Sequence, residues 1–160
     1  MKTPADIHRW LTDQGVSFRS RNHSPRFTAQ EVAAASSVTG HEMAKVILAR
    51  ADDRFLMAVV PATKRLSVPR LAGILHAREV RLATEEEFAP LFPGCDLGAM
   101  PPFGNLYGLE MMVDRSLSLH PEIAFNACTH VETVSMSWAD YERVARPVLV
   151  DITEPESHAA

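Results

Sequence analysis

Apolar residues fall in short stretches along this chain, and turn residues separate them. Two apolar runs, at residues 44–50 and 54–60, flank Asp52-Asp53, and this arrangement predicts a β-hairpin. Other stretches are rich in β-branched or alternating apolar residues, which favours extended structure. The further strands that we expect lie at residues 17–22, 79–83, 106–113, 122–127, 131–136 and 147–152.

Capping residues mark the starts of most of the expected helices. Thr3-Pro4 combines an N-cap with proline at the first helical position, and two Thr-x-x-Glu boxes and one serine mark other starts. The expected helices cover residues 3–15, 28–36, 69–76, 84–92 and 138–146. Short helices placed among hairpins predict an α/β protein of the α+β type, with a mixed and mostly antiparallel sheet, not a doubly wound parallel one.

Composition indicates a globular protein. Hydrophobic residues make up 46% of the 160 positions and charged residues 22%. We therefore expect one domain over residues 1–152 and a short disordered tail over residues 153–160. No apolar run is long enough to cross a membrane, and the N-terminus lacks the apolar segment of a signal peptide. The sequence thus predicts a cytoplasmic protein with no membrane partner.

The charge balance and the cysteine and histidine content exclude several kinds of site. A net charge of −4 argues against a protein that holds long stretches of nucleic acid, so we expect no DNA partner. Cys95 and Cys128 have no metal-type spacing, and we expect both to be reduced thiols. The seven histidines include no His-x-x-x-His pair. The sequence therefore predicts neither a metal site nor a cofactor.

Lys45 interrupts the apolar run from Met43 to Ala49. Burying an ammonium group is costly unless something pairs with it, so this lysine is expected to face a cavity, a partner carboxylate or an anionic ligand. The alternative is an alternating strand whose polar face reaches water.

A second unusual segment is the loop between two stretches that we expect to be ordered. Its residues are Gly98, Ala99, Met100, Pro101, Pro102, Phe103 and Gly104. Proline fixes φ and removes backbone donors, and glycine permits a positive φ or the close approach of a ligand. Such a stiff loop can present fixed backbone groups to a small polar ligand, although an ordinary tight connection remains the alternative.

Several short motifs, read in order, resemble one known family. The motifs are His23-Ser24, residues 28–33, Ala44-Lys45, residues 98–104, Phe125-Asn126-Ala127 and His130. Their order and spacing resemble the YbaK / prolyl-tRNA-synthetase-associated family of aminoacyl-tRNA editing domains, over about residues 5 to 150. The family's functional lysine matches Lys45, and its Gly-x-x-x-Pro loop matches Gly98 and Pro102. The resemblance implies a curved mixed sheet that closes toward a barrel and is surrounded by helices.

The resemblance also implies an activity, which is hydrolysis of the ester in a mischarged tRNA by a trans-editing deacylase. Lys45 would supply positive charge, the loop of residues 98–104 would hold the aminoacyl group, and His130 would order the site. His23 and Asn126 would contact the substrate. The implied partner is the acceptor end of an aminoacyl-tRNA, often tRNA-Pro carrying a small wrong amino acid, together with a synthetase or an elongation factor.

One departure limits what the resemblance implies about specificity. Members that remove alanine from tRNA-Pro commonly carry asparagine directly after the lysine, whereas this chain has Val46. The acyl preference is therefore open. A non-catalytic module that binds an aminoacyl or nucleotide group is the main alternative function. A third is an enzyme that forms a Schiff base through Lys45, which requires a lowered lysine pKa.

Overall fold

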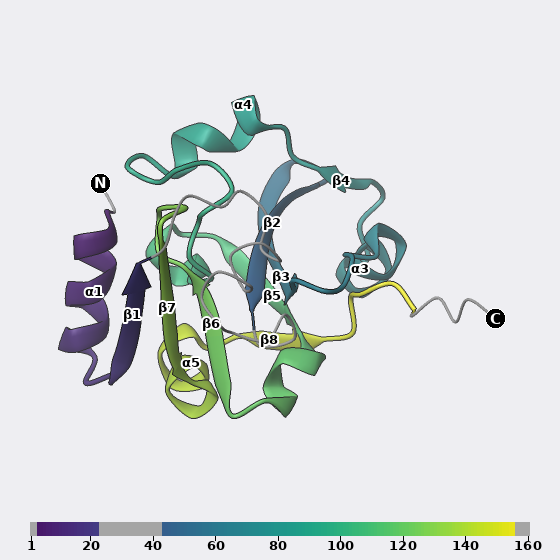
Figure 1. Ribbon diagram of the computed structural model, residues 1–160. Coiled ribbons are helices and arrows are strands. Elements are labelled where there is room, and N and C mark those ends of the chain that lie inside the picture. The colour runs from purple at the N-terminus through teal and green to yellow at the C-terminus, as the bar shows by residue number, and fades with distance from the viewer. Residues whose placement is uncertain (1–2, 23–42, 156–160) are drawn as a thin grey trace.

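Figure 1 shows the computed structural model, which describes residues 3–22 and 43–155. Eight strands in this part of the chain form two sheets. The three-stranded sheet has the order β1 (Phe18–Asn22), β7 (Glu132–Ser137), β6 (Glu122–Asn126). The five-stranded sheet has the order β4 (Val80–Leu82), β2 (Ala44–Ala51), β3 (Arg54–Pro61), β5 (Glu110–Asp114), β8 (Val148–Val150).

The predicted mixed and mostly antiparallel arrangement is confirmed. Strand β3 pairs with β5 in parallel, and β5 with β8 in parallel, whereas the other four strand pairs are antiparallel. The two sheets approach each other at a single parallel bridge between Met43 and Ala124. Among the described residues no closed barrel forms, so the implied closure stays a prediction.

Four α-helices and three short 3₁₀ helices connect the strands of the described chain. They are α1 (Pro4–Asp13), α3 (Val68–Leu75), α4 (Glu85–Phe88), α5 (Trp138–Ala145), η1 (Ala89–Leu91), η2 (Gly104–Leu106) and η3 (Arg115–Leu119). Thr3 caps α1 and Thr84 caps α4, each within a reciprocal capping box. The helix expected over residues 28–36 lies outside the described residues.

The strand expected over residues 106–113 is wrong in its first part. The chain instead forms η2 and then a turn in which Gly108 has φ +66°, so β5 begins only at Glu110. A positive φ is incompatible with the extended backbone of a strand, which explains the late start.

Two hydrophobic clusters pack on opposite faces of the five-stranded sheet. Alternation along β2 directs Leu48 into the larger cluster and Ala49 into the smaller. The larger cluster also contains side chains of α1, α5 and the three-stranded sheet, and Figure 1 shows α1 beside the edge strand β1. The smaller cluster includes Leu71 of α3 and Ile152 after β8. Both faces of this sheet are therefore covered.

The C-terminal end of the described chain is attached to the fold. Thr153 forms a bridge with Leu66, and the amide of Glu154 donates to the carbonyl of Arg65 at 2.8 Å. The described structure thus extends three residues into the stretch expected to be a tail. In the ranges that the structure describes, none of the helices has the length and hydrophobicity needed to span a bilayer.

Candidate functional site

The predicted loop begins with Gly98, whose backbone conformation strongly favours glycine. Gly98 has φ +88°, and a Cβ added there would lie 3.4 Å from Cε1 of His130. The Nε2 atom of His130 donates to the carbonyl of Leu97, 2.9 Å away. The structure therefore brings together Gly98 and His130, two of the residues predicted to act in catalysis. It also explains why this position needs a residue without a side chain.

The rest of the loop is anchored in the core. Phe103 is fully buried, with its ring 5.2 Å from Trp10, 5.2 Å from Phe125 and 5.5 Å from Tyr141 (centroid distances). The Tyr141 hydroxyl donates to the Pro102 carbonyl at 2.8 Å. Met100, Pro101 and Gly104 are buried as well, whereas Gly98 is exposed. The exposed part of the loop is thus its first part, around Gly98, and the later residues hold it in place.

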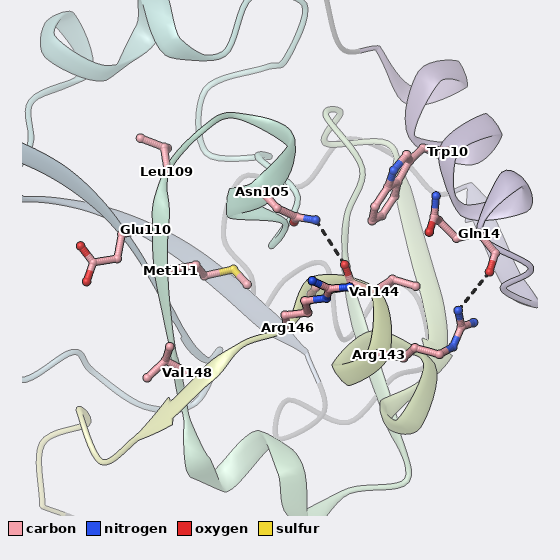
Figure 2. Close-up of a pocket in the computed structure, with 11 residues that line it drawn as sticks. Trp10, Gln14, Asn105, Leu109, Glu110, Met111, Arg143, Val144, Arg146 and Val148 are labelled. Atoms are coloured by element: carbon pink, nitrogen blue, oxygen red, sulfur yellow. Dashed lines mark hydrogen bonds between the residues drawn. The ribbon is translucent and has the colours of Figure 1, made fainter.

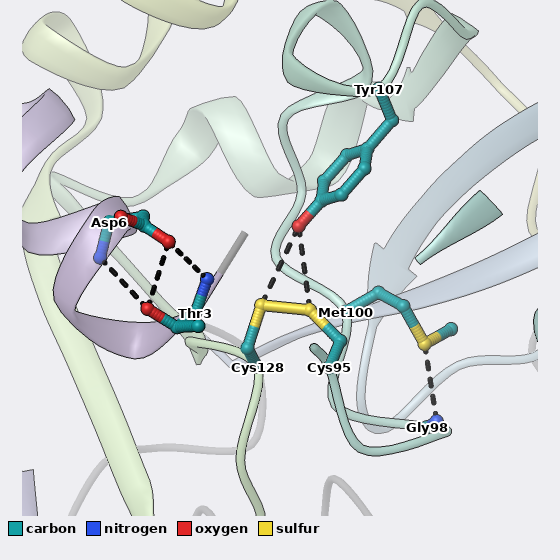
Figure 3. Close-up of a disulfide and its surroundings, with 7 residues drawn as sticks. All are labelled: Thr3, Asp6, Cys95, Gly98, Met100, Tyr107 and Cys128. Atoms are coloured by element: carbon teal, nitrogen blue, oxygen red, sulfur yellow. Dashed lines mark hydrogen bonds between the residues drawn. A yellow bond between two sulfur atoms is a disulfide. The ribbon is translucent and has the colours of Figure 1, made fainter. Parts of the chain in front are cut away.

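A disulfide, drawn in Figure 3, joins the segment just before the loop to the connection between β6 and β7. Cys95 and Cys128 form this bond, so the expectation of two reduced thiols is wrong for the structure described here. Two backbone hydrogen bonds lie beside it, from the Asp96 amide to the Cys128 carbonyl (2.9 Å) and from the Cys128 amide to the Ala99 carbonyl (2.8 Å). The two cysteines are 33 residues apart in sequence, and nothing in their spacing indicated that the fold pairs them.

Lys45 and Asn126 lie at the seam between the two sheets. Lys45 on β2 lies two residues after Met43, and Asn126 on β6 lies two residues after Ala124, the partner of Met43 in a parallel bridge. Because side chains alternate between the two faces of a strand, Lys45 and Asn126 point to the same face as this bridged pair. Asn126 is 8% exposed, and within the described part of the chain its Oδ1 atom has no hydrogen-bond partner. A buried carbonyl oxygen in this state is rare and favours a donor from outside the fold.

The Lys45 ammonium is also in an unusual environment. Burial lowers its pKa below the ordinary lysine value, and the positive charge of Arg65 lowers that pKa further. Across residues 3–22 and 43–155, no carboxylate forms an ion pair with Lys45, and no hydrogen bond joins it to the loop. Of the alternatives given by the sequence, a partner carboxylate is therefore not found in the described chain. His23 lies outside the described residues.

A separate cavity of about 650 Å³ opens on the other side of the loop, between α1, η2, β5 and α5. Figure 2 shows the residues that line it, and none of the predicted site residues is among them. Asn105, directly after Gly104, connects the cavity to the loop, and its side-chain amide donates to the Val144 carbonyl at 3.2 Å. Sequence reasoning missed this cavity because Trp10, Arg143 and Arg146 belong to no motif. In the described residues, no group of three His, Cys, Asp or Glu side chains is placed to hold a metal ion.

Comparison with known proteins identifies relatives by sequence. The sequence profile of the aminoacyl-tRNA editing domain matches residues 23–144. The chain is 28% identical over 146 residues to the multifunctional Ser/Thr-tRNA deacylase ProXp-y of Escherichia coli K12, covering 88% of this chain and 87% of that protein. It is 30% identical over 107 residues to the proline–tRNA ligase of Bacillus subtilis strain 168, which is 66% of this chain and 19% of that enzyme.

Solved structures agree on the fold. The hypothetical protein APE2540 superposes with a TM-score of 0.82 at 23% identity, over 92% of this chain and 99% of that one. A protein provisionally described as a trans-editing enzyme for prolyl-tRNA synthetase gives a TM-score of 0.81 at 20% identity, over 95% of this chain and 97% of that one. The sequence relatives confirm the resemblance and the class of activity predicted from the motifs, which is deacylation of aminoacyl-tRNA. The chain belongs to the family of aminoacyl-tRNA editing domains.

Proposed function

We propose that this chain acts in trans as an aminoacyl-tRNA deacylase whose site lies at the seam between the two sheets. The observation that carries the proposal is the position at this seam of a half-buried ammonium and a buried carboxamide oxygen, neither of which has a partner among residues 3–22 and 43–155. The ammonium needs an anion, and the carboxamide oxygen needs a hydrogen-bond donor. The end of an aminoacyl-tRNA carries both, since its phosphates are anions and the α-ammonium of its amino acid is a donor.

Each predicted residue has a role that follows from its chemistry. Lys45 neutralises the phosphate of the terminal nucleotide or the negative charge that develops on the ester oxygen. The carbonyl oxygen of Asn126 accepts a hydrogen bond from the α-ammonium or from a side-chain hydroxyl of the substrate. The backbone at Gly98 closes the acyl pocket, and His130 holds that backbone in position through Leu97.

The chemical step needs no nucleophile from the protein. Water attacks the ester carbonyl, the bond to the ribose oxygen breaks, and the proton of the water passes to that oxygen. The products are a free amino acid and an uncharged tRNA. The loop and the substrate's own 2′-hydroxyl hold the water in this scheme, so the protein contributes mainly charge and position. His23 completes the substrate site, and the buried residues 100–104 support the exposed start of the loop from behind.

A separate editing site is needed because a synthetase cannot distinguish similar amino acids well enough by binding alone. One methylene group changes binding by only about 1–3 kcal/mol, which is too little for accurate selection of small amino acids. The Escherichia coli relative is a Ser/Thr-tRNA deacylase, and other relatives are proline–tRNA ligases. We therefore propose a small wrong amino acid on tRNA-Pro as the substrate class. Val46, in place of the asparagine of alanine-removing members, supports a preference other than alanine.

The remaining parts of the proposal concern organisation and partners. The domain spans residues 1–152, and its curved sheets close toward a barrel. It acts in the cytoplasm, where charged tRNA is used, and it takes its substrate after release from a synthetase or in competition with an elongation factor. Only the acceptor end of the tRNA is held, because a chain of net charge −4 favours few phosphate contacts.

A deacylation panel tests the proposal. Purified protein is mixed with tRNA-Pro charged with Ala, Ser, Thr, Cys or Pro, and the loss of labelled amino acid is measured against buffer alone. We expect at least one small non-cognate ester to be cleaved well above the spontaneous rate, with Pro-tRNA spared. Binding of charged tRNA without cleavage of any ester would instead identify a non-catalytic module and refute the deacylase proposal.

A further inference from the structure

We propose that Cys95 and Cys128 form a reversible redox latch: their disulfide holds the exposed start of the loop against the β6–β7 connection, and its reduction releases the loop and slows deacylation. The effect on deacylation rests on the function proposed above. The effect on loop mobility does not, and the two are measured separately.

The position of the disulfide supports this inference. Cys95 is three residues before Gly98, and Cys128 lies between Asn126 and His130, so the bond joins the two segments that carry most of the proposed site. In the described structure, the Asp96–Cys128 and Cys128–Ala99 backbone hydrogen bonds and the bond from His130 to the Leu97 carbonyl also connect these two segments. Each such bond adds only modest net stability. After reduction, the loop start is therefore held against the β6–β7 connection by these three hydrogen bonds and the packing of Gly98 on His130, without a covalent link.

The surroundings of the two sulfur atoms favour a reversible reaction. Cys95 is partly exposed, which gives a reductant access, whereas Cys128 is only 2% exposed. The hydroxyl of Tyr107 lies 3.4 Å from the sulfur of Cys95 and 3.5 Å from that of Cys128. Burial raises the pKa of Tyr107, so the phenol stays protonated and can donate to either sulfur. Its ring is held by Phe92, with centroids 4.5 Å apart.

The exchange is balanced with a dithiol as the reductant. A thiolate of the dithiol attacks the sulfur of Cys95, the bond between the protein sulfurs breaks, and Cys128 leaves as a thiolate. The O–H of Tyr107 donates to this leaving thiolate. The second thiol of the dithiol then displaces Cys95, so that the dithiol becomes a disulfide and both cysteines gain one proton and one electron each. A disulfide oxidant of the same class reverses the reaction.

Reduction therefore affects the part of the proposed site that lies next to the disulfide. His130 and Asn126 lie on either side of Cys128, while Gly98 follows Cys95 across the bond. Loosening this contact leaves the seam lysine in place but allows the acyl-binding backbone to move. Catalysis that depends on fixed geometry is sensitive to such movement.

The experiment compares the oxidised protein, the protein reduced with dithiothreitol, and the Cys95→Ser variant. Mass spectrometry of the oxidised protein should find the Cys95 and Cys128 peptides linked, and reduction should separate them. Hydrogen exchange at the amides of Asp96 and Cys128 should become at least about tenfold faster on reduction. Deacylation should fall by about tenfold or more, and Cys95→Ser should behave like the reduced protein whether or not dithiothreitol is present.

Two results would overturn the latch. One is the absence of a linked peptide after exposure to oxidised dithiothreitol. The other is equal amide exchange and equal deacylation in the oxidised and reduced proteins. If neither form cleaves any charged tRNA, the deacylase proposal fails, and amide exchange alone then decides whether the cysteines control the loop.

Discussion

Replacing Gly98 with alanine tests whether the contact between the loop and His130 matters for activity. The backbone of Gly98 has φ +88°, and a residue with a Cβ in a left-handed conformation costs about 1–2 kcal/mol. The added methyl group would also lie 3.4 Å from Cε1 and 3.8 Å from Nε2 of His130. If the ring moves and its hydrogen bond to Leu97 weakens, a further cost of about 0.5–1.5 kcal/mol follows.

Gly108→Ala is the matched control for this change. Gly108 also has a positive φ, +66°, but no atom lies within 4 Å of an added Cβ. Both variants therefore carry the backbone cost, and only Gly98→Ala places a methyl group in contact with the His130 ring. We expect Gly108→Ala to lose about 1–2 kcal/mol of unfolding free energy and Gly98→Ala about 1.5–3.5 kcal/mol, as measured by urea denaturation.

The decisive assay is deacylation by the folded fraction of each variant. Gly98→Ala should lower the rate by about tenfold or more, because displacement of the loop backbone removes fixed groups from the acyl site. Gly108→Ala should keep the rate of the wild type. If both variants are destabilised as expected and both still deacylate at the wild-type rate, the contact between the loop and His130 is structural only.

Four other outcomes are expected. Lys45→Ala should lower deacylation by at least about tenfold, equivalent to about 1.4 kcal/mol, without loss of thermal stability, and Lys64→Ala is its control; an unchanged rate removes Lys45 from the mechanism. Because burial lowers the pKa of Lys45, the unfolded chain keeps this proton to higher pH than the folded chain. The unfolding free energy of the wild type relative to Lys45→Met should therefore rise with pH between the lowered pKa and 10.5, in urea titrations at several pH values. Tyr141→Phe removes the 2.8 Å bond to the buried Pro102 carbonyl and should cost about 1–3 kcal/mol in the same assay, and no loss would show that the carbonyl finds another donor. Deacylation should survive EDTA once the magnesium needed by the tRNA is restored, and a loss that only zinc reverses would contradict the absence of a metal from the mechanism.

Local sequence signals predicted most of the described elements. The capping boxes at Thr3 and Thr84 and the turn after β2, where Asp52 has φ +53°, depend only on residues close in the chain. The same holds for the unusual position of Lys45 on β2, because an isolated cation in an apolar run is visible in the sequence. Where a local signal was overlooked, as at Gly108, the predicted strand began too early.

The family resemblance carried the prediction of activity further than local patterns did. It linked Lys45, Gly98, Asn126 and His130 through their order in the chain, and the structure brings Gly98 against His130 and sets Lys45 and Asn126 at one seam. The resemblance did not separate residues of the loop that face solvent from those that anchor it. Phe103, for example, which the resemblance assigns to the substrate site, is fully buried against Trp10, Phe125 and Tyr141.

The sequence alone determined where most of the described helices and strands begin, which strand carries an isolated lysine, and which loop is stiffened by proline and glycine. These features follow from interactions between residues a few positions apart, so they can be read along the chain. Only the tertiary structure decided that Cys95 meets Cys128, that Met43 pairs with Ala124, and that the buried carboxamide oxygen of Asn126 has no partner in the part of the chain that the structure describes. Such contacts depend on which distant segments pack together. Burial of the whole core decides this packing, and no short stretch of sequence contains enough information to predict it.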